Sequence, residues 1–396
     1  MTSPLLAHFA LDPEITFLNH GSFGACPRVV LERQADLRAR LESEPVRFFV
    51  REAQRGIDAA RERIASLLGA APEDMVFVRN ATVGVNTVLA SLALAPGDEL
   101  LTTDHVYGAC RNALEHVAAK HGARVVVAHV PFPLASPDEV VDAVLAAAGP
   151  RTRLALLDHV TSPTGLVFPI AALVAALADR GIDTLVDGAH APGMLPLALS
   201  RLGAAYYTGN LHKWLCAPKG CAILHVRRDR QAGLRPLVVS HGATSRRPRP
   251  RLWEEFDWQG TDDPTPWICA PDALDALEAM VPGGLEGMRA MQRDLALHAR
   301  RRLSETLGVA PPAPESMLAA LVAMPLSPHT PTTTDSSWAI DPLGEALFSQ
   351  HRIEIPVFPF PAPPHRLIRI ACQVYVDRDD VERLCAALVE LGEGRA

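Results

Sequence analysis

Short apolar runs alternate with longer amphipathic stretches along the first 230 residues of the chain. In the longer stretches Leu, Val and Ala recur at three- and four-residue spacing, which predicts helices. The short runs are rich in Val, Leu and Tyr and have the length of buried strands. This alternation predicts an α/β fold in which helices cover both faces of a mostly parallel, seven-stranded sheet. The expected strands are 75–79, 99–103, 124–130, 153–159, 183–187, 204–208 and 221–226, with helices between them such as 82–94, 107–122, 137–149 and 170–181.

The pattern changes beyond residue 230. Residues 243–267 are rich in Pro, Arg and Trp, which predicts an irregular connection. After them, helical stretches mix with strand-like runs, which predicts a second, smaller α+β domain. The helices are expected at 272–280, 285–308 and 377–392, and the strands at 318–325 and 366–376. We therefore expect an N-terminal arm (1–30), a large domain (31–265) and a small C-terminal domain (266–396).

The composition is that of a soluble, globular, enzyme-sized protein, with 396 residues, 48% hydrophobic, 21% charged and a net charge of −7. This balance argues against a nucleic-acid partner, and the basic run 246–251 is short and interrupted by prolines, so we expect a solvated loop there. No apolar stretch reaches the roughly 18–20 residues of a membrane-spanning helix, and we expect no secretory signal, because the first residues carry no basic region. The seven cysteines have no CxxC spacing, which favours a reducing cytoplasm and argues against a metal site.

Several polar residues follow directly on expected strands. In open parallel sheets ligands bind beyond the carboxyl ends of the strands. Asp187 ends one strand, Lys213 follows a second inside a loop, and Ser162 and Thr164 follow a third. Residues 80–82 stand where a strand turns into a helix, so their N–H groups and a Thr hydroxyl could form an anion site.

Each of these residues also has a purely structural interpretation. Asp187 alone could cap the following turn, Asn80 with Thr82 could be a simple helix N-cap, and His212 could be a structural histidine. Taken together, however, a lysine, an acid and an anion site match the needs of a pyridoxal phosphate enzyme. Such an enzyme needs an amine for a Schiff base, a carboxylate for the pyridine nitrogen and donors for the phosphate.

Nine segments in the same order then carry a family resemblance over nearly the whole chain. The chain resembles the class V, fold-type I pyridoxal-phosphate-dependent aminotransferase superfamily, and within it the isopenicillin N epimerase-like group. The segments are "FLNHGSFGACP" (17–27), "EPVRFFVRE" (44–52), "RNATVGVNTVL" (79–89), "DHVYGA" (104–109), "HVTSPTG" (159–165), "VDGAHAPG" (186–193), "GNLHKW" (209–214), "QGTDD" (259–263) and "RLIRIA" (366–371).

The resemblance implies roles around the cofactor. Lys213 would bind pyridoxal phosphate as an internal aldimine and, once freed by substrate, carry the Cα proton. Burial lowers the pKa of a lysine and makes this second role possible. Asp187 would pair with the pyridinium nitrogen. His190 would contact the ring hydroxyl, with Ser162 as a second candidate.

The resemblance also assigns the stacking and phosphate contacts. Tyr107 would stack on the ring face away from Lys213, with His105 as the alternative. Two further contacts would come from the neighbouring subunit, which implies a homodimer with shared active sites. The expected phosphate contacts are Ala81, Thr82, Asn210 and His212 of one chain and Gly260 and Thr261 of the other.

The substrate implied is a small molecule, an α-amino acid. Arg369 resembles the family arginine that binds the substrate carboxylate, a task that suits its guanidinium fork, and the alternative is a salt bridge at the edge of a sheet. Asn19, Ser22 and Arg47 are expected to complete the substrate pocket.

The resemblance leaves the reaction open after an external aldimine forms and Cα is deprotonated. Epimerisation returns the proton from the opposite face, where Tyr107 or His105 would act. A C–S lyase instead expels a β-substituent, and an aminotransferase returns the proton to the cofactor. A cysteine desulfurase is disfavoured, because residues 354–366 contain no cysteine and Cys372 lies beyond Arg369. A non-catalytic binding subunit is the remote alternative, since Lys213, Asp187 and Arg369 are all present.

Overall fold

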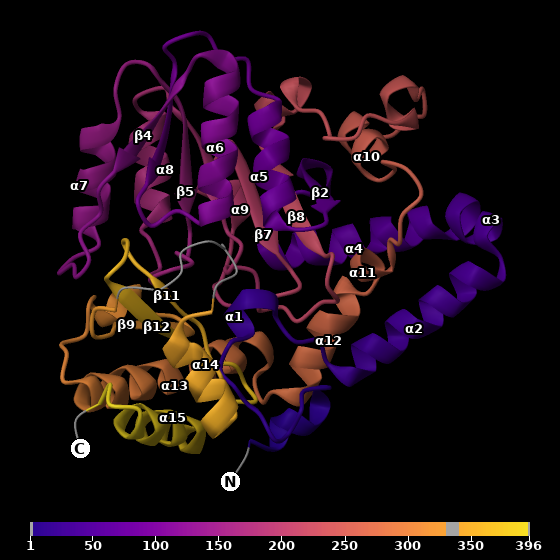
Figure 1. The fold of residues 1–396 in the computed structure, drawn as a ribbon. Helices are drawn as coiled ribbons and strands as arrows, with labels where there is room; N and C mark the ends of the chain where they lie inside the picture. The colour runs from indigo at the N-terminus through magenta and orange to yellow at the C-terminus, as the bar shows by residue number, and fades with distance from the viewer. Residues whose placement is uncertain (1–2, 330–339, 395–396) are drawn as a thin grey trace.

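The computed structural model describes residues 3–329 and 340–394, and its centre is a seven-stranded sheet (Figure 1). The strand order is β2-β8-β7-β6-β5-β3-β4. Only β8 runs antiparallel to its neighbours, so the sheet is mostly parallel and the predicted α/β fold is confirmed. The strands are β2 (Met75–Val78), β3 (Glu99–Thr103), β4 (Arg124–Ala128), β5 (Thr152–Asp158), β6 (Asp183–Asp187), β7 (Tyr206–Asn210) and β8 (Ala222–Val226).

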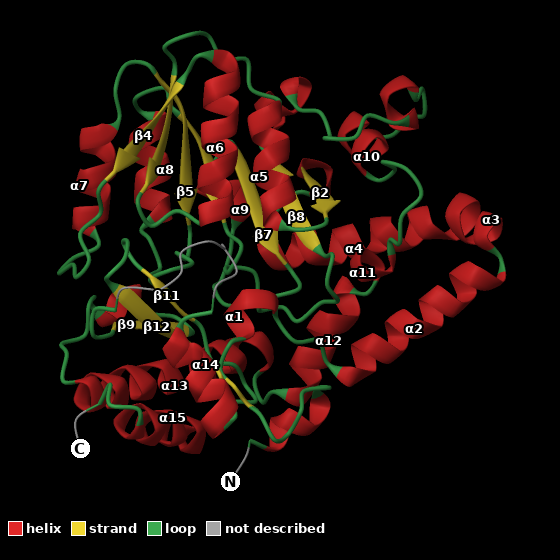
Figure 2. Ribbon diagram, in the orientation of Figure 1, coloured by secondary structure: helices red, strands yellow, loops and turns green. Residues whose placement is uncertain are grey.

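Alternation along each strand divides the apolar side chains between two cores. Val76 and Leu224 face one core, whereas their neighbours Phe77 and Ile223 face the other. Because successive side chains of a strand point to opposite faces, near-continuous apolar strands require helices on both sides. Figure 2 shows this layered arrangement. The first core is covered by α5 (Ala81–Ala90), α6 (Gly108–His121) and α10 (Arg251–Phe256), and the second by α4 (Ala53–Leu68), α7 (Asp138–Ala147), α8 (Ile170–Ala178) and α9 (Leu199–Leu202).

The C-terminal part is a smaller α+β unit around a three-stranded antiparallel sheet of order β11-β12-β9. The predicted strand 366–376 is too long, because β12 ends at Ala371 and the chain turns at Gln373. The strands are β9 (Leu321–Pro325), β11 (Val357–Pro359) and β12 (Arg366–Ala371), and the helices are α12 (Ala270–Met280), α13 (Gly284–Leu307), α14 (Pro342–His351) and α15 (Arg378–Glu390).

The N-terminal segment joins the C-terminal unit. Strand β1 (Thr16–Phe17) pairs in parallel with β10 (Ile353–Glu354), and the N–H of Ala371 donates to the carbonyl of Leu18. Helix α1 (His20–Phe23) then leads toward α2 (Arg28–Ser43) and α3 (Pro45–Arg47), which extend away from the rest of the molecule (Figure 1). The proposed division at residues 30 and 265 stays a prediction. Short non-α turns complete the elements at Pro4–His8, Phe48–Glu52, Pro72–Asp74, Arg228–Gly233, His241–Thr244 and Glu315–Met317.

The prediction of an irregular connection over 243–267 is wrong in part. This segment contains α10 and α11 (Thr265–Ile268). Its basic run is not a simple solvated loop either, because Arg249 is paired with Asp58 and with Asp257, the latter at 2.9 Å. Partners on a distant helix could not be read from the local abundance of Pro and Arg. Within the described ranges, no helix combines the length and apolar character needed to cross a bilayer.

Candidate active site

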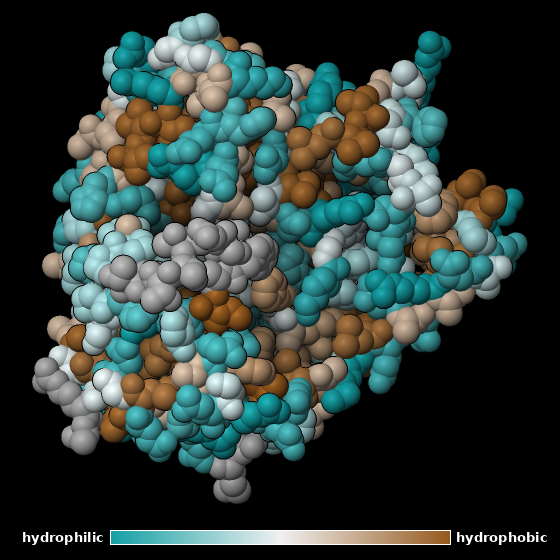
Figure 3. Space-filling view, viewed as in Figure 1, coloured by the Kyte–Doolittle hydropathy of each residue, from teal (hydrophilic) through white to brown (hydrophobic). Residues whose placement is uncertain are grey.

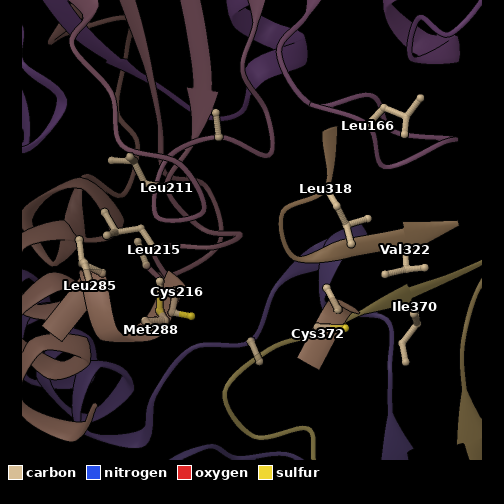
Figure 4. Close-up of a cluster of buried hydrophobic side chains, with 14 of the residues drawn as sticks. Leu166, Leu211, Leu215, Cys216, Leu285, Met288, Leu318, Val322, Ile370 and Cys372 are labelled. Atoms are coloured by element: carbon tan, nitrogen blue, oxygen red, sulfur yellow. The ribbon is translucent and has the colours of Figure 1, made fainter. Parts of the chain in front are cut away.

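Lys213 lies in the loop between β7 and β8, and this loop is firmly anchored. Leu211, Leu215 and Cys216 are buried in the core cluster that also contains Leu285 and Met288 of α13 (Figure 4). The Lys213 carbonyl lies 2.9 Å from Nε2 of the buried His20. The loop backbone therefore holds the lysine in place while its side chain points into the site.

The amine of Lys213 has a neutral partner. Its Nζ lies 3.3 Å from Nε2 of His190, and no carboxylate of the described residues forms a salt bridge with it. Burial, with a further contribution from Arg369, lowers the pKa of Lys213 to about 7, although Asp187 and Cys110 act in the opposite direction. A large part of the Lys213 population is therefore a free amine near neutral pH.

Asp187 ends β6 and is buried. Its Oδ1 accepts from the N–H of Ala189 at 2.9 Å, and its Oδ2 accepts from the thiol of Cys110 at 3.2 Å. Burial raises the pKa of Asp187, and Lys213 partly offsets that rise. Asp187 thus accepts a bond from the backbone of Ala189, as the capping interpretation requires. Its buried carboxyl group also lies among the candidate site residues.

Two residues beside Asp187 had no place in the predicted site. Asp158 lies directly opposite Asp187 in the β5–β6 register, is buried, and has no partner for its Oδ2 among the described residues. Burial and the neighbouring Asp187 hold the pKa of Asp158 well above its usual range. Asp158 could have been found from the sequence, because it stands at the carboxyl end of a predicted strand. The second residue, Cys110, could not, because its approach to Asp187 depends on how α6 packs.

Arg369 of β12 lies close to His190. It is 4% exposed, and its Nη1 donates to the carbonyl of Ser162 and to the Ser162 hydroxyl at 3.3 Å. Its Nε has no partner, and its guanidinium lies 5.5 Å from the ring centroid of Phe358. No described carboxylate pairs with it, so the alternative of a sheet-edge salt bridge is wrong. Ser162 therefore contacts Arg369. This contact gives no support to the prediction that Ser162 meets the cofactor ring hydroxyl.

The N-terminal helix α1 lies against these groups. A Cβ at Gly21 would lie 3.5 Å from Nη2 of Arg369 and 3.6 Å from Cε1 of His190. The neighbouring Ser22 donates its hydroxyl to Oδ1 of Asn19 at 2.5 Å. Asn19 and Ser22 thus flank Gly21, which lies beside Arg369 and His190, and they are bonded to each other.

The first residues of α5 offer some, but not all, of the hydrogen-bond donors expected for an anion site. Asn80 is an N-cap, since its Oδ1 accepts from the N–H of Val83 at 2.9 Å, as the structural alternative expected. The N–H of Ala81 is already bonded to Oδ1 of Asn210 at 2.8 Å. The N–H and hydroxyl of Thr82 have no protein acceptor among the described residues. His212 donates from Nδ1 to the carbonyl of Cys221 at 2.9 Å, which leaves its Nε2 available.

Tyr107 and His105 have very different surroundings. Tyr107 is 45% exposed, and partial burial, with Cys110 and Asp187, raises its pKa, while Arg369 acts in the opposite direction. His105 is fully buried, with its Nδ1 2.8 Å from the Thr164 hydroxyl and its Nε2 3.2 Å from the carbonyl of Val130. Since both ring nitrogens of His105 are occupied, Tyr107 is the better candidate for a group that faces the cofactor.

The remaining predicted residues do not join this cluster within one chain. Arg47 is exposed on α3 and paired with Glu44 and Glu52, the latter at 2.7 Å. Gly260 and Thr261 are exposed. They line a groove of about 850 Å³, and Val83 of α5 lines the same groove.

The residues present fit a pyridoxal phosphate group. An amine, a buried acid and a guanidinium, none of them in a salt bridge among the described residues, lie close to one another around His190 and α1. Lys213 could hold the aldehyde carbon, Asp187 the ring nitrogen, and Thr82 with His212 the phosphate.

Comparison with known proteins agrees with this geometry. Residues 22–384 match the family model of aminotransferase class-V, and the chain belongs to this family. It is 39% identical to isopenicillin N epimerase of Amycolatopsis lactamdurans over 400 residues, which covers 97% of each chain. It is 37% identical to isopenicillin N epimerase of Streptomyces clavuligerus, covering 96% and 95% of the two chains. It is also 31% identical to a probable chloroplastic L-cysteine desulfhydrase of Arabidopsis thaliana, covering 95% and 83%.

Solved structures share the fold. The cystine C-S lyase C-DES in complex with cysteine persulfide superposes with a TM-score of 0.79 at 24% identity, over 96% of this chain and 98% of that one. The cysteine desulfurase CsdA of Escherichia coli gives a TM-score of 0.76 at 23% identity, over 97% and 96%. The predictions of the family, of a fold-type I enzyme and of pyridoxal phosphate as its cofactor are confirmed.

Proposed function

We propose that this enzyme removes the Cα proton of an α-amino acid and returns it from the opposite face, as an epimerase. The observation that carries Cα deprotonation is the position of Lys213, whose Nζ lies 3.3 Å from Nε2 of the buried His190 and forms no salt bridge with a described carboxylate. An amine with a pKa near 7 is suited to accept a proton at neutral pH, because the best base has a pKa close to the working pH.

Arg369 and Lys213 would have different roles toward the substrate. Arg369 would bind the substrate carboxylate, since its guanidinium is buried, charged and without a carboxylate of its own. Its bonds to Ser162 fix the direction of the fork. Lys213 would take the Cα proton on its own side of the bound substrate.

Pyridoxal phosphate, when bound, supplies an electron sink for the electrons that the Cα–H bond leaves behind. Asp187 would hold its ring nitrogen through a buried carboxylate, which Ala189 and Cys110 keep in position. His190 would donate from Nε2 toward its hydroxyl, as predicted. Thr82, Asn210 and His212 would contact its phosphate at the start of α5.

Tyr107 is the proposed acid on the second face. Its hydroxyl has no partner among the described residues, and burial raises its pKa, so it carries a proton at neutral pH. The identities of 39% and 37% with two isopenicillin N epimerases support this proposal.

A C–S lyase acting on a cysteine-derived substrate is the second candidate. The relationship at 31% identity to a probable L-cysteine desulfhydrase favours it, and a β-elimination needs no second acid. A cysteine desulfurase is disfavoured by the sequence, because residues 354–366 contain no cysteine. The cysteines of the chain are all free and buried, which suits the proposed cytoplasmic location.

We further propose a homodimer in which Gly260 and Thr261 contact the partner's cofactor phosphate. Apolar side chains lie exposed around the groove that Thr261 lines, among them Val50 (74%) and Val238 (52%). Figure 3 shows hydrophobic groups gathered near α3 and beside α10. Burying such side chains in a second subunit is favourable, and light scattering should find a dimer. A monomer that binds pyridoxal phosphate with full affinity would contradict the shared site.

One experiment separates the two candidate reactions. The cofactor-loaded enzyme is incubated in deuterium oxide with a panel of L-amino acids and cysteine conjugates. An epimerase should exchange the Cα hydrogen and form both stereoisomers. Pyruvate and ammonia from a cysteine conjugate, without inversion of any amino acid tested, would replace the epimerase with the lyase.

A further inference from the structure

Trp214, directly after the candidate catalytic lysine, is the largest fully buried side chain of the described residues. It belongs to a small core cluster with Val160, Met194 and Leu321. Gly193 is required beside it, because the chain has a positive φ of 91° there and a Cβ would lie 2.5 Å from the Trp214 carbonyl. The indole can therefore neither rotate nor withdraw without disturbing this packing.

The indole nitrogen has one partner, and that partner is in the site. Nε1 of Trp214 donates to Nδ1 of His190 at 3.2 Å. An indole N–H can only donate, so Nδ1 of His190 must be the unprotonated acceptor. Burial and the nearby cations hold the pKa of His190 well below its usual value, so the ring is neutral. The single ring proton is then on Nε2.

The proton on Nε2 has a direct consequence for Lys213. Nε2 lies 3.3 Å from the lysine Nζ. An N–H can donate to a free amine, which has a lone pair, but not to an ammonium group, which has none. With Trp214 in place, the imidazole therefore favours the neutral form of the lysine.

We propose that Trp214 is a positioning residue whose indole N–H sets the tautomer of His190, so that His190 presents an N–H to Lys213 and to the cofactor that this pocket would take. The inference deepens the proposed function and rests on it. It concerns protons of the chain itself, so it can be tested without the cofactor.

Other charged groups act on the same pair and must be kept constant in any test. Arg369 lowers the pKa of both Lys213 and His190, while Asp187 and Cys110 raise that of Lys213. The remaining groups that face His190 are His20 and His212. A substitution of Trp214 by phenylalanine changes none of these charges.

The first measurement is made on the full-length, cofactor-free wild-type protein labelled with ¹⁵N-histidine. Nitrogen NMR at pH 7 to 8 should show His190, assigned through a His190→Gln sample, as a neutral ring with its proton on Nε2. A proton on Nδ1, or on both nitrogens, would overturn the proposal. This measurement needs no variant of Trp214 to fold.

The second measurement compares Trp214→Phe with Trp267→Phe, a control in which another largely buried indole loses a bond of 3.0 Å, made to the Gly220 carbonyl and not to His190. Arylation of Lys213 by trinitrobenzenesulfonate is followed by mass spectrometry against pH. Without the indole donor, Nε2 can become an acceptor and stabilise the ammonium. We expect the midpoint of Trp214→Phe to rise by roughly one pH unit, which lowers the rate at pH 7 about fivefold.

The Trp267→Phe midpoint should stay at the wild-type value. An unchanged midpoint in a folded Trp214→Phe protein would reduce Trp214 to a packing residue. Both measurements use cofactor-free protein, so they test the tautomer of His190 separately from the proposed function. A negative result would reject the role of Trp214 and leave the proposed Cα deprotonation untouched.

Discussion

Two groups of buried charged side chains in this molecule are arranged in opposite ways. Where α4 meets α10, the fully buried Arg61 donates to Asp58 at 2.8 Å and to Asp257, and its guanidinium lies 4.2 Å from the ring centroid of Trp253. Arg249 adds a second cation to the same carboxylates. Every charge of this cluster has an opposite charge beside it.

Around Lys213 the charges are also buried, but they are not paired. Lys213, Arg369 and Asp187 form no salt bridge with one another or with another described residue. Burying an unpaired charge is costly, so the protein shifts pKa values or leaves the charges for a ligand. The comparison teaches that burial alone does not distinguish a structural cluster from a site, whereas the absence of partners does.

The contrast recurs within β12. Arg366 pairs with Asp341 at 2.7 Å and with Glu393, whereas Arg369, three residues along the same strand, has no carboxylate among the described residues. Both side chains are buried, at 7% and 4% exposure. The paired arginine is expected to serve stability, and the unpaired one to serve binding.

The largest effect is expected from Lys213→Ala. Removing the amine would delete both the proposed cofactor attachment and the proposed proton acceptor, so exchange of the Cα hydrogen in deuterium oxide should fall by at least about ten-thousandfold. Borohydride reduction and peptide mapping should find the cofactor on Lys213 in the wild type and nowhere in the variant. Cofactor fixed to another lysine in the wild type would show that the lysine is wrongly assigned.

Asp257→Ala should affect stability and leave the chemistry intact. It leaves Arg61 and Arg249 buried with one carboxylate fewer, so the free energy of unfolding in urea should fall by about 3–5 kcal/mol. The exposed pair of Arg63 and Glu278 offers the control, since Glu278→Ala should cost much less. If the two variants were equally stable, the buried cluster would not be a structural one.

Arg369→Gln should weaken substrate binding rather than folding. Loss of one charge-assisted interaction of about 1.5–3 kcal/mol corresponds to a rise in KM of roughly ten- to a hundredfold. Arg366→Gln is the matched control on the same strand, and it should lower the stability with little change in KM. A reversed pattern would place the carboxylate site elsewhere.

The pKa of Lys213 predicts a pH-dependent stability. Its folded value of about 7 lies below the ordinary value of 10.5, so the unfolded chain binds the extra proton between these two pH values. The cost of burying the ammonium is full below pH 7 and disappears as the pH rises toward 10.5. Cofactor-free Lys213→Met should therefore be more stable than the wild type at pH 6, by up to about 5 kcal/mol.

This advantage should shrink as the pH rises through 8 and 9, a range that follows from the lowered pKa of Lys213. Urea denaturation at a series of pH values measures it. A difference independent of pH would mean that Lys213 is protonated in the folded protein.

The most selective effect is expected from Tyr107→Phe, which keeps the ring and removes only the hydroxyl. If Tyr107 is the acid opposite Lys213, inversion should fall about a hundredfold, while exchange of the Cα hydrogen by Lys213 should largely remain. Chiral chromatography and mass spectrometry measure the two rates in one sample. Equal losses of both would indicate that Tyr107 only positions the cofactor.

The sequence by itself determined the order of strands and helices and the chemistry at the strand ends. Short apolar runs and three- and four-residue spacings are local patterns, and they placed all seven strands of the main sheet to within two residues. Asp187 and Lys213 could be singled out because a parallel sheet carries its carboxyl ends along one edge. The nine segments of family resemblance added the cofactor, which no local pattern could have identified alone.

Only the tertiary structure decided which of these polar groups have partners. The pairing of Arg249 with Asp58 and Asp257, the approach of Cys110 to Asp187 and the bond from Trp214 to His190 join residues from separate elements. Arg366 and Arg369 cannot be told apart in "RLIRIA". In the folded chain Arg366 lies beside Asp341 and Glu393, whereas Arg369 has no described carboxylate beside it. The physical reason is that burial and pairing depend on side chains far away in the chain, whereas hydrophobic periodicity depends only on near neighbours.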